Sequence, residues 1–168
     1  FIRFVTSNNF VPLLRNTFLL ALYSLLWGFP IPIVLALMMN ELRSERVKRG
    51  VQTITYAPHF ISMVVMCGLI RLYTQDTGVV VQALSLFGFE PVSLLSRAEY
   101  FVPVYVLSGV WQGMGWGSVI YFSVLAGVDP GMHEAAYMDG ATKLQRILHI
   151  DIPSIAPTMV IMLILNCG

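Results

Sequence analysis

Long uncharged runs of apolar residues alternate with short charged connections along this chain. Three runs contain no Asp, Glu, Lys or Arg, namely residues 17–39, 50–70 and 101–128. A fourth apolar run begins at Ile155 and continues to the end of the sequence at Gly168. Each complete run is long enough to cross about 30 Å of hydrocarbon as a helix, and each is apolar all round rather than along one stripe. The pattern predicts an all-α integral membrane protein with about three full spans and part of a fourth.

Details of these runs refine the expectation. Pro30 and Pro32 predict a kink in the first run, which a helix in a bundle tolerates when neighbours satisfy the freed carbonyl groups. The third run is longer than a span requires, so we expect it to tilt or to begin at the interface. Phe1 is not an initiator residue and the fourth run is cut short. We therefore expect residues 1–168 to be one transmembrane domain, incomplete at both ends.

The charged connections indicate the orientation of the spans. The connection 40–49 carries four basic residues and residues 129–153 carry two more, whereas residues 71–100 have two arginines against three acidic residues. Because cytoplasmic loops carry an excess of Lys and Arg, residues 40–49 and 129–153 are expected to be cytoplasmic and residues 71–100 external. The short apolar stretch 78–88 is expected to lie along the interface or to cap the bundle.

Composition excludes several classes of protein. The chain is 57% hydrophobic and 11% charged with a net charge of +1, whereas soluble domains carry about 25% charged residues, and no basic run suggests a nucleic-acid partner. The two cysteines form neither a disulfide framework nor a metal site by their spacing. The sequence has no phosphate-binding loop, no Ser-His-Asp set and no cofactor fingerprint. We therefore expect a chain that is not itself an enzyme and that holds neither cofactor nor metal.

The connection 129–153 predicts two short helices separated by a bend. Asp129 and Pro130 form a favourable N-cap and first-turn pair, so a first helix is expected from Pro130 to Met138. Gly140 suits the left-handed backbone conformation that commonly ends a helix.

The second helix of this connection has its own start and stop signals. Thr142 and Gln145 have the spacing of a capping box, which predicts a helix beginning there. Pro153 is expected to stop that helix just before the fourth span. A capped pair of helices with an apolar face is suited to docking on another protein. A pair lying flat on the lipid surface is the alternative, and physical reasoning alone leaves the two interpretations equal.

The residues of this connection resemble a family signature. The order Glu-Ala-Ala, three residues, Gly, nine residues, then Ile-x-Leu-Pro is typical of the permease subunits of binding-protein-dependent ABC importers. This chain keeps the spacing and departs from it at Ile152, where the family has Leu. The matching residues are Glu134, Ala135, Ala136, Asp139, Gly140, Ile150 and Pro153.

The resemblance implies a multispan helical bundle of the type I ABC importer permease (MetI-like) fold. It implies that residues 129–153 are the coupling segment, which fits a cleft of a cytoplasmic ATPase subunit. Glu134 is then the polar contact, Ala135 and Ala136 allow close approach, and Gly140 makes the bend. ATP and Mg²⁺ are expected on the partner ATPase and not on this chain.

The remaining partners are also implied by the resemblance. They are a second permease subunit, identical or homologous, and an extracytoplasmic solute-binding protein, assembled in the lipid bilayer of a bacterial cytoplasmic (inner) membrane. Residues 28–41, 111–130 and the Pro58-His59 pair are similar to the branch that takes up complex or oligomeric sugars, although Val81 stands where that branch has Asn. Alternatives are a permease of the same fold for amino acids, peptides or another small solute, or an integral-membrane scaffold or enzyme.

Candidate pathway residues lie in the second and third runs. Sugars are held by aromatic faces and by amide or hydroxyl hydrogen bonds, which Trp111, Gln112, Trp116 and Tyr121 could supply, although aromatic residues near a membrane boundary are more often interface anchors. His59 is the one titratable group of the second run, and such groups suggest function. A neutral imidazole bonded to a carbonyl group freed by Pro58 is the simpler account.

Glycines mark a helix-packing face of the third run. Gly109, Gly113 and Gly117 recur every four residues, with Gly115 beside them, and such rows allow close approach of another helix. Helix packing is the expected role, and a gate hinge is the alternative. The basic connection Arg43–Arg49 is interpreted as a topology determinant and lipid-headgroup contact.

Overall fold

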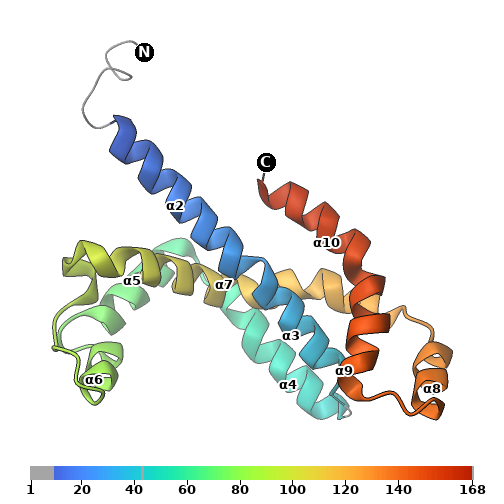
Figure 1. Ribbon diagram of the computed structural model, residues 1–168. Helices are drawn as coiled ribbons and strands as arrows, with labels where there is room; N and C mark the ends of the chain where they lie inside the picture. Colours follow the sequence, from blue (N-terminus) through green and yellow to red (C-terminus); the bar gives the residue numbers. More distant parts are fainter. Residues whose placement is uncertain (1–9, 43, 168) are drawn as a thin grey trace. The chain divides into compact units, whose positions relative to one another are not determined.

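The computed structural model describes residues 10–42 and 44–167, so Arg43 of the basic connection lies outside the described residues. The regular elements within these ranges are all helical, which confirms the predicted all-α class (Figure 1). In chain order they are α2 (Phe10–Gly28), α3 (Pro30–Asn40), α4 (Glu45–Tyr56), the 3₁₀ turn η1 (Ala57–Phe60), α5 (Met63–Thr74), α6 (Val79–Ser85), the 3₁₀ turn η2 (Leu94–Ser96), α7 (Ala98–Ala126), α8 (Pro130–Met138), α9 (Lys143–Arg146), the π-helical turn η3 (Ile147–Asp151) and α10 (Ile152–Cys167).

Three helical stretches of the described residues are long and apolar enough to cross a membrane: Phe10–Asn40, Met63–Ser85 and Lys143–Cys167. The first contains the predicted run 17–39 and begins earlier, at Phe10. It is interrupted at Phe29, directly before Pro30, where the sequence predicts a kink. The predicted run 101–128 corresponds to α7, which has 29 residues. Its glycines, tryptophans and Gln112 lower its hydropathy, so it is not among the three stretches, and its crossing of the membrane stays a prediction.

The predicted run 50–70 is not one continuous helix. Pro58 has no backbone N–H to donate, and the chain passes there from α4 into the turn η1. A new helix, α5, begins after Ser62, whose side-chain oxygen accepts a hydrogen bond from the Val65 N–H at 3.4 Å. The structure therefore divides this run into a helix end, a turn and a capped helix start.

Backbone proximity divides the described residues into two compact units, the first of residues 10–28 and 60–111 and the second of residues 29–42, 44–59 and 112–167. The core of the second unit is a cluster of buried side chains from α3, α7 and α10. Burial of this apolar surface joins the three helices. The cluster consists of Ile33, Ala36, Tyr121, Leu125 and Ile155.

Two glycines of α7 allow other helices of the second unit to approach closely. A Cβ atom at Gly115 would overlap the backbone carbonyl group of Thr55 in α4. A Cβ atom at Gly117 would lie 3.2 Å from Cγ of Pro32 in α3. A Cβ atom at Gly109 or Gly113 would meet no described atom within 4 Å. Gly117 thus packs as predicted, Gly115 makes the tightest contact, and a packing role for the other two stays a prediction.

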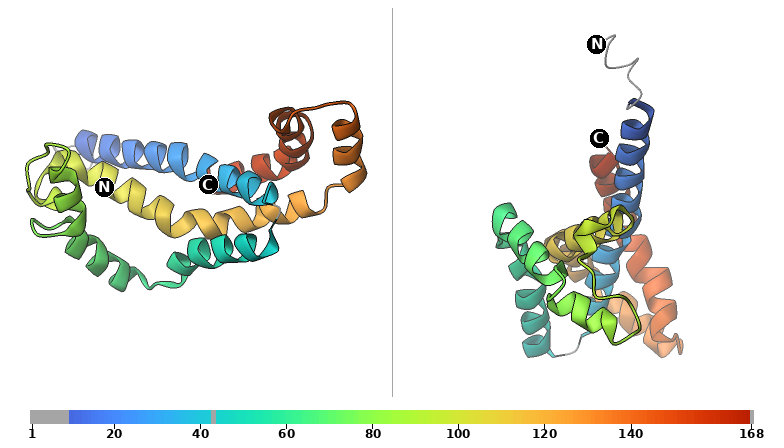
Figure 2. Two further views of the ribbon diagram at one scale, coloured as in Figure 1. Left: turned by 90° about the horizontal axis from the view of Figure 1, so that it is seen from below. Right: turned by 90° about the vertical axis from the view of Figure 1, so that its left-hand side faces the viewer.

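In the first unit, α6 and the connection that follows it lie beside α5 (Figure 2). These elements and the start of α7 surround an apolar cavity of about 920 Å³. Val81, at which the sequence departs from the sugar-uptake branch, is 1% exposed and lines this cavity together with Trp111. The predicted short apolar stretch 78–88 therefore forms part of a packed cap over α5 within this unit.

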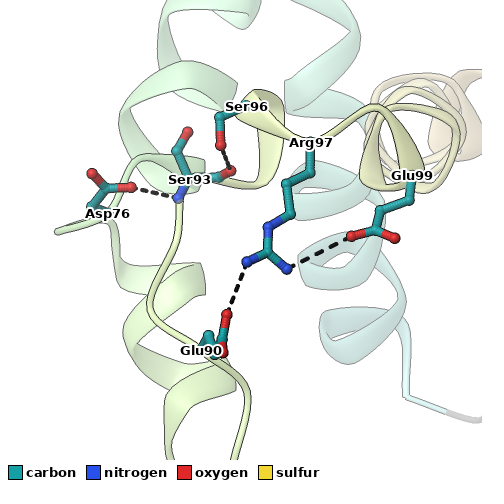
Figure 3. Close-up of polar contacts among 6 residues, drawn as sticks. All are labelled: Asp76, Glu90, Ser93, Ser96, Arg97 and Glu99. Atoms are coloured by element: carbon teal, nitrogen blue, oxygen red, sulfur yellow. Dashed lines mark hydrogen bonds and ion pairs between the residues drawn. The ribbon is translucent and has the colours of Figure 1, made fainter.

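Polar contacts close the connection between α5 and α7, residues 75–97, which we call the Arg97 segment (Figure 3). The Asp76 carboxylate accepts a hydrogen bond from the Ser93 N–H. The Arg97 guanidinium contacts Glu90 at 2.8 Å and Glu99 at 3.7 Å. Its hydrogen bond to Glu90 raises the pKa of Arg97 above its ordinary value. All three side chains of this ion-pair cluster remain well exposed to solvent.

Candidate functional site

Residues 129–153, which we call the EAA segment, contain α8, α9 and the turn η3. The first helix begins as predicted: the Asp129 carboxylate accepts a hydrogen bond from the Gly131 N–H at 2.9 Å, and Pro130 occupies the first turn. The helix ends at Met138, also as predicted. Both ends of α8 are thus determined by local capping chemistry.

A glycine with positive φ ends α8. Gly140 has a φ of +77°, and its N–H donates to the Tyr137 carbonyl group at 3.0 Å. The next N–H, of Ala141, donates to the carbonyl group of Ala136 at 2.9 Å. This pair of bonds is a Schellman motif, which satisfies carbonyl groups at a helix end and favours glycine in the left-handed position. The spacing from the alanine pair to Gly140 is therefore that of a helix and its C-terminal cap.

The second helix begins with the predicted capping box. The Gln145 N–H donates to the Thr142 side-chain oxygen at 3.4 Å, and the Thr142 N–H donates to the Gln145 side-chain oxygen at 2.8 Å. Two backbone donors that have no partner within the helix are satisfied in this way. Only residues 139–142 separate α8 from α9, so the connection between the two helices is short and ordered by hydrogen bonds at both ends.

The prediction that Pro153 stops the second helix is wrong. The helix continues from α9 through η3 into α10, and Pro153 is the second residue of α10. At the end of η3 the Ile152 N–H donates to the carbonyl group of Ile147, five residues earlier. A proline ring ordinarily collides with the carbonyl group four residues before it. The wider π-turn directly before Pro153 adjusts the hydrogen-bond ladder there, so the helix bends without ending.

The signature residues line a concave surface. Ala136, Asp139, Gly140 and Ile150 all border a cavity of about 320 Å³ formed by the end of α8 and the start of the second helix. Glu134 borders a separate cavity of about 500 Å³, together with Glu41, which follows α3, and with basic side chains of α8 and α9. The structure thus brings four of the predicted coupling residues together around one concavity and places Glu134 at another.

Apolar side chains of the EAA segment are open to solvent. Tyr137 is 70% exposed and Met138 is 84% exposed at the end of α8. On the second helix Leu144 and Leu148 are exposed, whereas Ile147, predicted on the same face, is half-buried. Exposed apolar side chains beside a concavity lined by both polar and apolar residues are suited to a protein partner. An interfacial position on lipid would expose similar residues, so this alternative stays open.

One ion pair lies within the EAA segment, and a second connects it with the residue that follows α3. His133 of α8 lies 3.3 Å from the Asp151 carboxylate in η3, and Lys143 of α9 lies 3.8 Å from Glu41, which follows α3. Sequence reasoning treated these residues only as loop charges. An acidic residue within the apolar sequence Ile150-Asp151-Ile152 was the available signal, because a carboxylate in such surroundings requires a partner.

The candidate pathway residues are divided by the structure. The His59 and Trp116 rings stack in parallel, with centroids 4.8 Å apart and planes inclined by 2°, and both side chains are exposed. Tyr121 is 3% exposed in the core of the second unit, which leaves its ring little access to a solute. Trp111 lines the apolar cavity of the first unit. The stacked His59 and Trp116 rings form an aromatic platform of the kind that binds sugars, and the pathway roles of Trp111, Gln112 and Tyr121 stay predictions.

Comparisons with known proteins identify the family. Residues 13–168 match the family of binding-protein-dependent transport system inner membrane components. The chain belongs to this family. The signature in the EAA segment is therefore that of the family, and the chain is part of an integral membrane protein of the transport type rather than an enzyme.

Individual members of this permease family are similar over nearly the whole chain. The polygalacturonan/rhamnogalacturonan transport system permease YteP of Bacillus subtilis is 41% identical and Protein LplB of the same organism 40% identical, covering 100% and 98% of the chain. A bacterial ABC transporter that imports the acidic polysaccharide alginate has a solved structure with a TM-score of 0.92, 40% identity and 98% coverage. The MetI-like permease fold is thereby confirmed. The chain spans about half the length of these relatives, 53% of YteP, 52% of LplB and 58% of the solved chain.

Proposed function

We propose that the protein containing this chain is the permease subunit of an ATP-driven importer for sugars or oligosaccharides. The observation that carries the proposal is the EAA segment itself: two short helices, both capped, joined by a left-handed glycine beside exposed apolar side chains. A short, hydrogen-bonded pair of helices transmits a displacement better than a flexible loop. The family membership of residues 13–168 supports the same proposal.

The proposed mechanism uses the EAA segment as the contact with a separate ATPase. In this arrangement residues 129–153 and 40–49 are cytoplasmic and residues 71–100 are external. Closure of the ATPase dimer on ATP and Mg²⁺, both held by the ATPase, displaces the EAA segment. The spans then change from inward-facing to outward-facing. Glu134 supplies the polar contact, and the exposed Tyr137 and Met138 supply apolar area.

The remaining partners are a second permease subunit, identical or homologous, and an extracytoplasmic solute-binding protein. A related solved structure supports the latter, because that alginate transporter is in complex with an alginate pentasaccharide-bound periplasmic protein. Two proteins that are about 40% identical to this chain belong to transporters of acidic polysaccharides, polygalacturonan/rhamnogalacturonan and alginate. Oligosaccharides that contain uronic acids are therefore the first substrates to examine, followed by neutral oligosaccharides such as those named for the relative AraP.

The test measures uptake of labelled mono- and oligosaccharides by cells that carry the full-length system. Gly140→Pro and Gly140→Asn form a matched pair of variants. Proline fixes φ near −65° and cannot adopt the φ of +77° found here, whereas asparagine tolerates the left-handed region. Membrane levels of all variants are compared by immunoblot. We expect Gly140→Pro to abolish uptake and Gly140→Asn to retain most of it.

Two results would contradict parts of this proposal. If no sugar enters although the complex assembles, the carbohydrate assignment is wrong, and amino acids and peptides are examined next. If uptake continues unchanged in the Gly140→Pro variant, the bend is not required and the mechanical role of the EAA segment is wrong, whatever the substrate.

A further inference from the structure

Asp151 is a buried carboxylate within a candidate membrane span. Its exposed fraction is 1%, and neither carboxylate oxygen accepts a hydrogen bond from any of the described residues. It lies in η3, the π-turn that joins α9 to α10. A buried carboxylate without hydrogen bonds is unfavourable unless a cation lies close by.

The nearest ionisable partner of Asp151 comes from the first helix of the EAA segment. His133 of α8 places its Nε2 atom 3.3 Å from Oδ1 of Asp151, and its side chain is 25% exposed. The other charged groups that act on Asp151 are Arg146, one turn earlier on its own helix, and Glu41 at the end of α3. The negative charge of Glu41 repels that of Asp151. Glu41 is itself paired with Lys143 at 3.8 Å. The contact from α8 to the base of α10 thus runs through His133 and Asp151.

This contact gives α8 a second connection to the span. The first is the chain itself, which passes through residues 139–142 and turns at Gly140. This backbone connection joins α8 to the second helix at one end of α8 only. His133 and Asp151 are 18 residues apart in sequence, and Asp151 is buried. Their contact restrains rotation of α8 relative to α10. α8 and α10 are then held at two points instead of one.

We propose that His133 and Asp151 are positioning residues that transmit the displacement of α8 to α10. The inference rests on the proposed function, because it requires that α8 be displaced by the ATPase. Neither residue belongs to the family signature, and neither is needed for contact with the ATPase in the mechanism above. Their role is to keep the two helices moving together, so that ATP hydrolysis results in transport.

The test uses the full transporter with its ATPase and binding protein, reconstituted in liposomes. The measured quantity is the number of ATP molecules hydrolysed per sugar imported, for Asp151→Asn, His133→Gln and the double variant. Each single variant is expected to raise this ratio about threefold or more, since residues along a coupling path alter coupling without touching a ligand. The double variant is expected to equal the more affected single variant, because either change already breaks the contact.

A ratio distinguishes a positioning role from a purely structural one, because loss of folded protein lowers hydrolysis and transport together. The reversed pair, His133→Asp with Asp151→His, is expected to restore part of the coupling. Glu45→Gln is the matched control, since it removes a carboxylate that is 68% exposed and that contacts Lys48 at 3.3 Å. That control is expected to leave the ratio unchanged.

Several outcomes overturn the inference. If both single variants leave the number of ATP molecules hydrolysed per sugar unchanged, the His133–Asp151 contact does not transmit the displacement. The same conclusion follows if the effect of the double variant is the product of the two single effects. Failure of both single variants to assemble shows a folding role instead. Gly140→Pro is measured in parallel. If it abolishes transport while the His133 and Asp151 variants are unaffected, only the proposed role of the His133–Asp151 contact is wrong. If Gly140→Pro transports normally, the proposed function of the EAA segment is wrong.

Discussion

The EAA segment and the Arg97 segment contain the same kinds of local structure and use them differently. Each contains a short helix that ends before a glycine with positive φ, +77° at Gly140 and +88° at Gly88. Each also contains an ion pair between residues distant in sequence or separated by a turn. The two segments therefore allow a comparison in which similar elements differ mainly in their surroundings.

Burial is the principal difference between the two ion pairs. The Asp151 side chain is 1% exposed, whereas the side chains of Arg97 and Glu90 are 41% and 76% exposed. Exposed pairs contribute little because solvent and salt screen them, whereas removing one partner of a buried pair leaves an uncompensated charge. A short contact distance alone, 2.8 Å in the exposed pair, does not make an interaction important. The burial of the carboxylate determines how much stability is lost when the ion pair is broken.

The largest effect is expected from His133→Ala. This change leaves the buried Asp151 side chain without its imidazole partner and should destabilise the assembled permease by about 3 kcal/mol. Asp151→Asn should cost less, because the imidazole that remains is 25% exposed and can be hydrated. Thermal unfolding of the purified complex measures both variants. Equal losses in the two would show that burial of the carboxylate is not what makes the pair important.

Local rules explain which parts of the EAA segment were predictable. The N-cap at Asp129, the end of α8, the bend at Gly140 and the capping box at Thr142 all follow from residues within a few positions of one another. The sequence-based expectation that Pro153 stops a helix used the same kind of local rule and is wrong. A π-turn before the proline accommodates it, and the preference of proline for helix ends is overridden there.

Features that depend on distant residues could not be predicted. His133 and Asp151 meet only because the chain turns back between them. The tight contact at Gly115 depends on the position of α4. The regular spacing of glycines pointed to Gly109, Gly113 and Gly117, of which Gly117 lies close to Pro32 while the other two have open surroundings among the described residues. The likeness of the sequence to a known family supplied the fold, while the internal contacts required the structure.

Replacing the two positive-φ glycines is expected to have an intermediate effect. A Cβ atom at Gly140 or Gly88 would meet no described atom within 4 Å, so alanine introduces backbone strain without a collision. Gly140→Ala and Gly88→Ala should therefore each cost about 1 kcal/mol, the penalty of the left-handed region for a residue with a Cβ atom. Thermal unfolding should give similar losses, but uptake should fall only for Gly140→Ala. Equal loss of uptake in both would contradict a special role for the EAA segment.

The smallest effect is expected from Arg97→Gln. This change removes the contacts with Glu90 and Glu99. The midpoint temperature of thermal unfolding at low salt should decrease only slightly. The difference from the parent protein should vanish at high salt, because exposed ion pairs are screened. The Asp76 carboxylate still accepts the Ser93 N–H, so the segment keeps a second closure. A large loss of uptake with unchanged stability would assign Arg97 a direct contact with the solute or its binding protein, and the two segments would then both be functional.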